Sequence, residues 1–185
     1  MPRHTDERTS RRLLHSRQVT CNGYVRSDGL YEIEGRLQDI KTDDSDMFFK
    51  YVRAGEPIHQ MRLRLVIDLD LVIHDVEAFT EAGPTPYCAQ INASYTQLIG
   101  LKIGSGFKKQ VFQRVGASLG CTHLTELLGP MATTAFQTTF FFQHQAQQQK
   151  HANNSSAPVP RPWVIGTCHA YRTDGEAVRL IWPEG

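Results

Sequence analysis

The feature that most constrains the fold is a pair of alternating apolar stretches in the first half of the chain. Residues 61–68 and 71–78 both place apolar side chains at nearly every second position, and only a two-residue turn separates them. A period of two is typical of a half-buried β-strand, and so short a connection joins antiparallel partners. The chain therefore contains a β-hairpin with one apolar face, and another layer must cover that face.

Turn signals predict two further hairpins. Residues 19–26 and 30–37 flank a Ser-Asp-Gly turn, and residues 163–171 and 177–182 flank a Thr-Asp-Gly turn. An Asp-Gly pair between alternating stretches is a strong hairpin signal. Together the three hairpins predict an antiparallel sheet.

Three segments between the second and third hairpins have helical spacing of their apolar residues. They are residues 89–99, residues 107–115 and a long run that opens near Thr122. Pro130 should bend or break the last of these, because proline removes a backbone hydrogen bond and clashes with the preceding turn. The order of strands, helices and strands predicts an α+β fold, with an antiparallel sheet of hairpins covered on one face by three helices.

The length of 185 residues suits one domain with a substantial core. Residues 1–17 are basic and poor in apolar side chains, so we predict a disordered arm followed by a single α+β domain over residues 18–185. A stretch rich in Gln, Asn, Ser and Pro near residues 146–161 predicts a flexible segment. We expect that both segments can be shortened without loss of the fold.

Composition argues against several classes of partner and location. The net charge of +1 creates no field for nucleic acid, and no apolar run approaches the roughly 20 residues of a membrane span. The four cysteines are widely spaced and no export signal accompanies them. We therefore expect reduced thiols in a cytoplasmic protein with neither nucleic-acid nor membrane partners.

Cys121 and His123 are the first candidates for chemistry. They lie at the start of the long helical run, where Thr122 is a plausible N-cap, and the positive end of a helix favours a cysteine thiolate. His123 is close enough in sequence to line the same cavity. The alternative is structural: a small buried cysteine and a histidine that caps a turn.

Other side chains are candidates for binding a ligand. Glu34 and Arg36 share the polar face of a predicted strand, where they either line a cleft or are simply solvated. The loop at residues 41–55 carries an apolar patch and has the character of a flap. We expect a small-ligand pocket to need apolar walls, and the candidates are Phe48, Phe49, Tyr51, Tyr87 and Phe136.

Four stretches together resemble the bacterial family DUF2889, a family of unknown function. They are residues 31–37, 59–70, 120–128 and 167–170, and the resemblance covers nearly the whole chain from Val19 onward. The resemblance implies a setting in bacteria that degrade aromatic compounds.

A more distant resemblance is to iron–sulfur cluster scaffold proteins of the IscU/NifU type. Aligned on the strand pair, His59 falls where the scaffold has its Asp, Cys88 at its middle Cys and Cys121 at its last Cys. The first scaffold Cys has no counterpart, which argues against cluster assembly. The resemblance implies a metal site formed by His59, Cys88 and Cys121, with one Zn as the expected ion and an open fourth position. A metal-free polar pocket remains the alternative, since no C-x-x-C pair is present.

These residues lead to competing functions. The first is a small-molecule enzyme with His59, His123 and Cys121 as catalytic residues and Glu34, Arg36, Tyr51 and Tyr87 as substrate-binding residues. Its substrate would be an aromatic compound, in one version derived from lignin, and its reaction a lyase step in which His123 acts as base and formaldehyde is released. The alternatives are a metal- or sulfur-carrying module and a structural metal site. A homodimer remains open.

Overall fold

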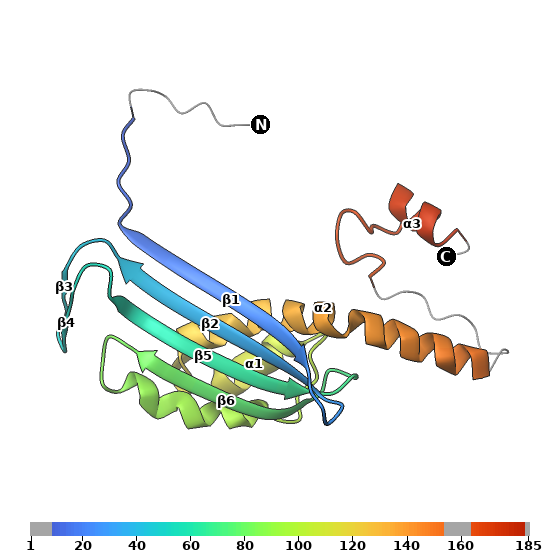
Figure 1. Cartoon of the computed structure of the whole chain (residues 1–185), viewed down its shortest axis with the longest axis horizontal. Helices are drawn as coiled ribbons and strands as arrows, with labels where there is room; N and C mark the ends of the chain where they lie inside the picture. The colour runs from blue at the N-terminus through green and yellow to red at the C-terminus, as the bar shows by residue number, and fades with distance from the viewer. Residues whose placement is uncertain (1–8, 154–163, 184–185) are drawn as a thin grey trace. The chain divides into compact units, whose positions relative to one another are not determined.

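The computed structural model describes residues 9–153 and 164–183 (Figure 1). The chain divides into two compact units, Met1–Gln143 and His144–Gly185, and each is described by itself. The first unit holds β1 (His15–Val25), β2 (Tyr31–Lys41), β3 (Ser45–Asp46), β4 (Tyr51–Val52), β5 (Pro57–Ile67), β6 (Ile73–Ala82), η1 (Cys88–Leu98), α1 (Phe107–Val115), η2 (Ala117–Leu119) and most of α2 (Thr122–Asn153). The second unit holds the end of α2 and α3 (Glu176–Ile181).

The main sheet of the first unit has four antiparallel strands in the order β1-β2-β5-β6. The predicted α+β class and antiparallel sheet are confirmed. Two predicted hairpins also form, β1–β2 and β5–β6. The first turns at Gly29, whose φ of 83° favours glycine, and the Leu30 amide donates to Asp28 there.

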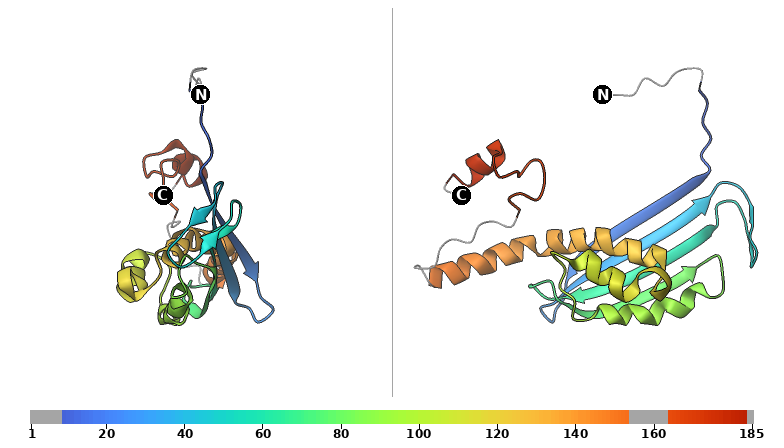
Figure 2. Two further views of the ribbon diagram at one scale, coloured as in Figure 1. Left: turned by 90° about the vertical axis from the view of Figure 1, so that its left-hand side faces the viewer. Right: turned by 180° about the vertical axis from the view of Figure 1, so that it is seen from behind.

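The two faces of the sheet differ because successive side chains point to opposite sides. In β2 the buried side chains include Tyr31, Ile33 and Leu37, and in β5 they include Leu63 and Leu65. Helices η1, α1 and α2 cover this apolar face (Figures 1 and 2).

The other face of the sheet carries charged side chains. Arg64 lies at its centre and pairs with Glu32, Asp75 and Glu77 from the neighbouring strands. A four-stranded sheet with one packed face and one polar face follows from the alternation in the sequence.

Close packing of α2 on the sheet depends on a residue without a side chain. A Cβ added at Gly35 would lie 2.5 Å from Met131 Sδ and 2.8 Å from Met131 Cγ. Both residues are buried. Gly35 thus lets α2 approach β2 and brings the start of α2 close to the sheet.

Two predictions about regular structure in the first unit are corrected. Strand β1 begins at His15, so residues 15–17 of the predicted disordered arm are in the sheet; residues 1–8 of that arm lie outside the described residues. Helix α2 continues through Pro130, so the break that was one of the two expected effects of this proline does not occur. Pro130 removes the donor to the carbonyl of Glu126, which is an exposed residue, so water can bond this carbonyl instead.

The prediction of a third hairpin near the C-terminus is wrong. The described residues 164–183 form turns and the short helix α3, with Gly175 preceding the helix. The predicted flexible segment near residues 146–161 overlaps the end of α2, which reaches Asn153, and its remainder lies outside the described residues.

Replacing Gly35 tests the packing of α2. We expect Gly35→Ala to lower the free energy of unfolding by about 1–3 kcal/mol, because the added methyl group overpacks the contact with Met131. Denaturant unfolding measures this change. Gly104→Ala is the matched control, since nothing lies within 4 Å of a Cβ added there, and it should change stability by no more than about 0.5 kcal/mol. Equal stability of the two variants would contradict the packing described.

Candidate functional site

The candidate site is built on one rung of the sheet. In the strand register Arg17 of β1 pairs with Asp39 of β2, and Asp39 pairs with His59 of β5. The three side chains point to the same face of the sheet, the one that the helices cover. A slip of one residue in either strand pair would turn one of them to the opposite face.

Asp39 is the centre of this rung, and its side chain is only 1% exposed. Its Oδ1 accepts from Arg17 Nε at 2.8 Å and lies 3.1 Å from His15 Nε2. Its Oδ2 accepts from Arg17 Nη2 at 2.8 Å and lies 3.0 Å from His59 Nδ1. An ionised carboxylate can only accept, so His59 Nδ1 carries a proton in this arrangement. The other ring nitrogen of His59, Nε2, is then free to act as a base when the ring is neutral.

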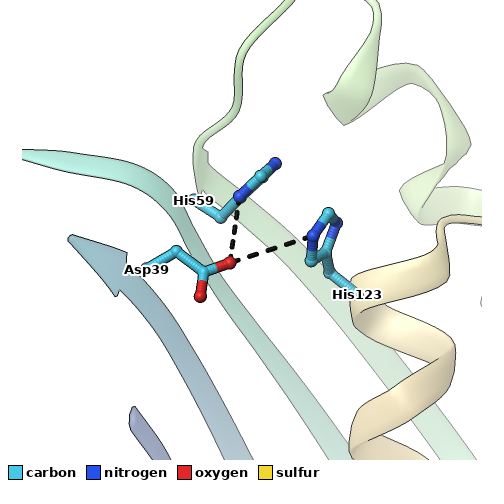
Figure 3. A group of neighbouring side chains, drawn as sticks. All are labelled: Asp39, His59 and His123. Atoms are coloured by element: carbon cyan, nitrogen blue, oxygen red, sulfur yellow. Dashed lines mark hydrogen bonds and ion pairs between the residues drawn. The ribbon is translucent and has the colours of Figure 1, made fainter. Parts of the chain in front are cut away.

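His123 comes to the site from the first turn of α2 (Figure 3). Its Nε2 lies 3.8 Å from Asp39 Oδ2, and its ring centroid lies 3.8 Å from that of His59. The two imidazoles are tilted by 31° against each other. The side chains of His59 and His123 are 16% and 23% exposed, so a small molecule has limited access to both.

A buried tyrosine holds the start of α2 in place. The Cys121 amide donates to the Tyr95 hydroxyl at 3.0 Å, and that hydroxyl lies 2.8 Å from both the Cys121 carbonyl oxygen and Thr125 Oγ1. Thr125 Oγ1 in turn donates to the carbonyl oxygen of Val115. Burial raises the pKa of Tyr95, so the hydroxyl stays a neutral link between η1 and α2.

Cys121 borders the imidazoles, as the sequence predicted. Its Sγ lies 4.0 Å from His123 Nδ1 and 3.8 Å from Met61 Sδ. The structure therefore brings together the three residues predicted as catalytic, His59, His123 and Cys121. It adds Asp39, which the sequence reasoning missed.

The charges around Asp39 set the protonation of the site. Burial opposes ionisation of Asp39, but the hydrogen bonds and charge of Arg17, with help from His59 and His15, outweigh it and lower the pKa from 3.8 to about 2. Burial also lowers the pKa of His59, the neighbouring His123 lowers it further, and Asp39 opposes both effects. His59 is therefore neutral at physiological pH.

The same atoms could hold a metal ion. Among the described residues, one group of three or more His, Cys, Asp or Glu side chains has its ligand atoms within 4.8 Å of one another: Asp39, His59 and His123. The predicted set of His59, Cys88 and Cys121 does not form such a group, and Cys88 Sγ instead lies 3.2 Å from Thr85 Oγ1. Two imidazoles and a carboxylate are suitable ligands for Zn.

The residues predicted to bind substrate lie in three places. Glu34 and Arg36 lie on the polar face of the sheet, because they alternate with the residues that share the face of Asp39. Tyr51 hydrogen-bonds to Asp44 within the β3–β4 hairpin. Tyr87 precedes η1 and packs against Phe49. Neither Glu34 nor Arg36 therefore shares the face of the imidazoles.

A groove of about 1300 Å³ lies between α1 and α2. Its walls are mainly apolar and include Phe107, Phe112 and Phe136, the last of which was predicted as a wall of the ligand pocket. Glu126 lines this groove and also pairs with Arg17 at 2.7 Å. Neither His59 nor His123 lines it, so the cluster of titratable groups and the apolar groove are separate features.

A signal for Asp39 was present in the sequence. The residues of β2 that face the helices are Tyr31, Ile33, Gly35, Leu37 and Asp39. An acid that continues an apolar alternation must be buried, and a buried acid needs partners. Arg17 and His15 gave no such signal, because neither is followed by an alternating apolar pattern.

The fold and the site define a class: an α+β protein whose sheet ends in a buried carboxylate contacted by arginine and histidine side chains. The chain belongs to the family described as "Protein of unknown function (DUF2889)", which matches residues 15–137. No curated protein and no solved structure matches the chain. The resemblance to IscU/NifU-type scaffolds stays a prediction. Each helix within residues 9–153 and 164–183 is too short or too polar to cross a membrane.

The depressed pKa of Asp39 predicts how stability depends on pH. A carboxylate with a lower pKa in the folded state stabilises the fold above the unfolded value of 3.8, and this contribution is lost as pH falls toward 2. We therefore expect the difference in unfolding free energy between the wild type and Asp39→Asn to shrink by about 2 kcal/mol from pH 5 to pH 2. Denaturant titrations of both proteins across this range measure it.

His59 should affect the pH dependence of stability in a separate range, at higher pH than Asp39. Because its pKa is lowered in the folded state, the unfolded chain takes up the proton first, and stability falls as pH drops below 6.5. This loss should be absent in His59→Gln and present in Gln60→Ala, which changes a non-titrating neighbour on the opposite face. A wild type and His59→Gln with parallel profiles between pH 7 and 5 would refute the assignment.

Proposed function

We propose that the chain is an enzyme acting on a small molecule, with His59 as general base and His123 as general acid. One observation carries the proposal: Asp39 accepts a hydrogen bond from His59 Nδ1 at 3.0 Å and so leaves His59 Nε2 free. A carboxylate that fixes the orientation and tautomer of a histidine is a recurrent arrangement in acid–base catalysis. Asp39 is a positioning residue in this proposal, and Arg17 keeps it ionised.

The stacked pair of imidazoles supports a division of roles. Two imidazolium rings with centroids 3.8 Å apart would repel, which favours a pair that carries at most one proton. One ring can then accept a proton while the other donates one. The sequence reasoning assigned the base to His123; we now assign it to His59, because the hydrogen bond to Asp39 orients that ring.

The proposed reaction is a lyase step on an aromatic compound that carries a hydroxymethyl group. His59 Nε2 takes the hydroxyl proton, the carbon–carbon bond to the hydroxymethyl carbon breaks, and formaldehyde leaves. The electron pair of that bond goes to the remaining carbon, which takes a proton from His123. Atoms and charge balance without an oxidant or a reductant. The substrate class, which includes lignin-derived aromatics, rests on the family resemblance.

Formaldehyde release tests this proposal. Purified protein incubated with a panel of aromatic alcohols should release formaldehyde from at least one of them, and His59→Gln should lower the rate by about 100-fold or more. The matched control is His74→Gln. His74 forms an equivalent pair with Asp68, at 2.8 Å on the exposed surface, and its loss should leave the rate unchanged. Undiminished turnover in His59→Gln would overturn the assignment of the base.

A metal-dependent enzyme is the second candidate, and the group of Asp39, His59 and His123 favours it. The distances of 3.0 and 3.8 Å from Asp39 Oδ2 to the two nitrogens bracket the roughly 3.3 Å between ligands around a tetrahedral Zn with bonds near 2.0 Å. Three protein ligands would leave a position for water or substrate. The two candidate functions require different states of His59 Nδ1. In the acid–base enzyme this nitrogen carries a proton, and in the metal enzyme it would bind the metal.

Elemental analysis of the same preparation separates them. About one equivalent of Zn and loss of turnover on chelation would favour the metal enzyme, whereas turnover that resists chelation would favour acid–base chemistry alone. The carrier module predicted from the sequence would show bound iron or transferable sulfur instead. None of the four cysteines forms a disulfide, and Cys121 lies beside the imidazoles. Four free thiols are consistent with the cytoplasmic location that we propose.

A further inference from the structure

The hairpin formed by β3 and β4 occupies a particular place in the chain. It is the connection between β2 and β5, so Asp39 lies just before it and His59 lies just after it. Figure 2 shows the hairpin at the end of the sheet where β2 ends and β5 begins. Any ligand that the hairpin holds is therefore held at the end of the sheet that carries the two side chains.

The hairpin is anchored on several sides. Asp44 accepts from the Tyr51 hydroxyl and from the Ala54 amide, and the Gly55 amide donates to the Lys41 carbonyl. At its base Val52 is buried.

A second tie joins the hairpin to the segment before β1. Arg12 Nη1 donates to both carboxylate oxygens of Asp43, at 2.8 Å and 2.7 Å. The Thr42 amide donates to the Leu14 carbonyl and the Thr42 hydroxyl to that of Leu13. These hydrogen bonds hold the base of the hairpin against β2 and the segment before β1.

Three aromatic rings form a row on this anchored hairpin and the loop before η1. Phe48 contacts Phe49 edge-on with centroids 4.9 Å apart, and Phe49 contacts Tyr87 edge-on at 5.7 Å. The residues are 95%, 48% and 60% exposed. Tyr87 follows the end of β6 and the hairpin precedes the start of β5, so the row lies at the end of the sheet where β5 begins and where His59 is found.

We propose that Phe48, Phe49 and Tyr87 form an aromatic platform that binds an aromatic ring of a small-molecule ligand. Three large apolar rings exposed side by side are costly to leave in water, and aromatic rings prefer edge-on and offset contacts with other aromatic rings. The platform selects planar ligands, and it holds them at the end of the sheet that carries His59. A role of the platform in turnover rests on the function proposed above. Binding of an aromatic ring by the platform is independent of that function.

The test measures binding without catalysis. The probe is 2-naphthalenemethanol, its saturated counterpart is decahydro-2-naphthalenemethanol, and both are titrated by ligand-observed NMR into full-length His59→Gln protein. The naphthyl probe should bind more tightly than the saturated one. In Phe48→Leu/Tyr87→Leu its affinity should fall about fivefold or more, because leucine keeps apolar area but removes two ring faces.

The matched control is Phe112→Leu. Phe112 is 63% exposed on α1 and lines the separate α1–α2 groove, so its replacement should leave the affinity unchanged. Circular dichroism checks that each variant is folded, which the exposure of the replaced side chains leads us to expect.

Several results would overturn the platform. The first is equal affinity of the protein for the two probes. The second is an affinity for the naphthyl probe that is unchanged in the double variant, or that falls as much in Phe112→Leu. The third is a double variant that differs from its parent only in self-association of the protein. Binding that depends on the platform, in a protein that releases no formaldehyde, would refute the proposed function and leave the platform standing. Formaldehyde release by a protein that binds the probe equally well without the platform residues would refute the platform and leave the proposed function standing.

Discussion

The ionised carboxylate of Asp39 is the group on which the site depends. A charge buried on the packed face of a sheet costs several kcal/mol unless hydrogen-bond donors surround it. Arg17 and His15 from β1 and His59 from β5 provide these donors, so the carboxylate links three strands at one level of the sheet. The strand register and the protonation of the site are therefore two consequences of the same interaction.

Helix α2 adds the second imidazole, and its position depends on packing at two points. Gly35 lets the helix lie close to β2, and the Tyr95 hydroxyl fixes the backbone of Cys121 just before the helix begins. His123 then faces Asp39 Oδ2 next to His59. The arrangement joins a base that is oriented by a buried acid to a neighbour that can donate a proton. Neither ring would have this relation to the other without the close approach of helix and sheet.

The sequence predicted the fold well where apolar periodicity was strong and failed where it was absent. The spacing in α1 predicted its bounds, and the alternation in β2 and β5 predicted two strands, but β2 ends four residues later and β5 begins four residues earlier than predicted. The predicted start of β1 at residue 19 was four residues too late. Nearly all residues of this strand are exposed and it pairs along only one edge, so it has little apolar alternation. That error hid Arg17 and His15, and with them the partners of Asp39. His59, His123 and Cys121 were found from their residue types. The group of close potential ligands contains Asp39 and His123 rather than the predicted Cys88 and Cys121, because a linear sequence does not report which face a cross-strand neighbour shares. In the second unit, alternation at Val178, Leu180 and Trp182 suggested a strand, whereas the chain forms the short helix α3.

The most direct test of the central claim is the position of the proton on the His59 ring. Long-range ¹H–¹⁵N NMR correlation of the histidine side chains near pH 7.5, assigned with His59→Gln, reports it for each ring. The account predicts a neutral His59 ring with the proton on Nδ1, where it is donated to Asp39, and an unprotonated Nε2. A proton on Nε2, or a His59 Nδ1 that carries a metal instead of a proton, would contradict the claim that Asp39 orients a free base.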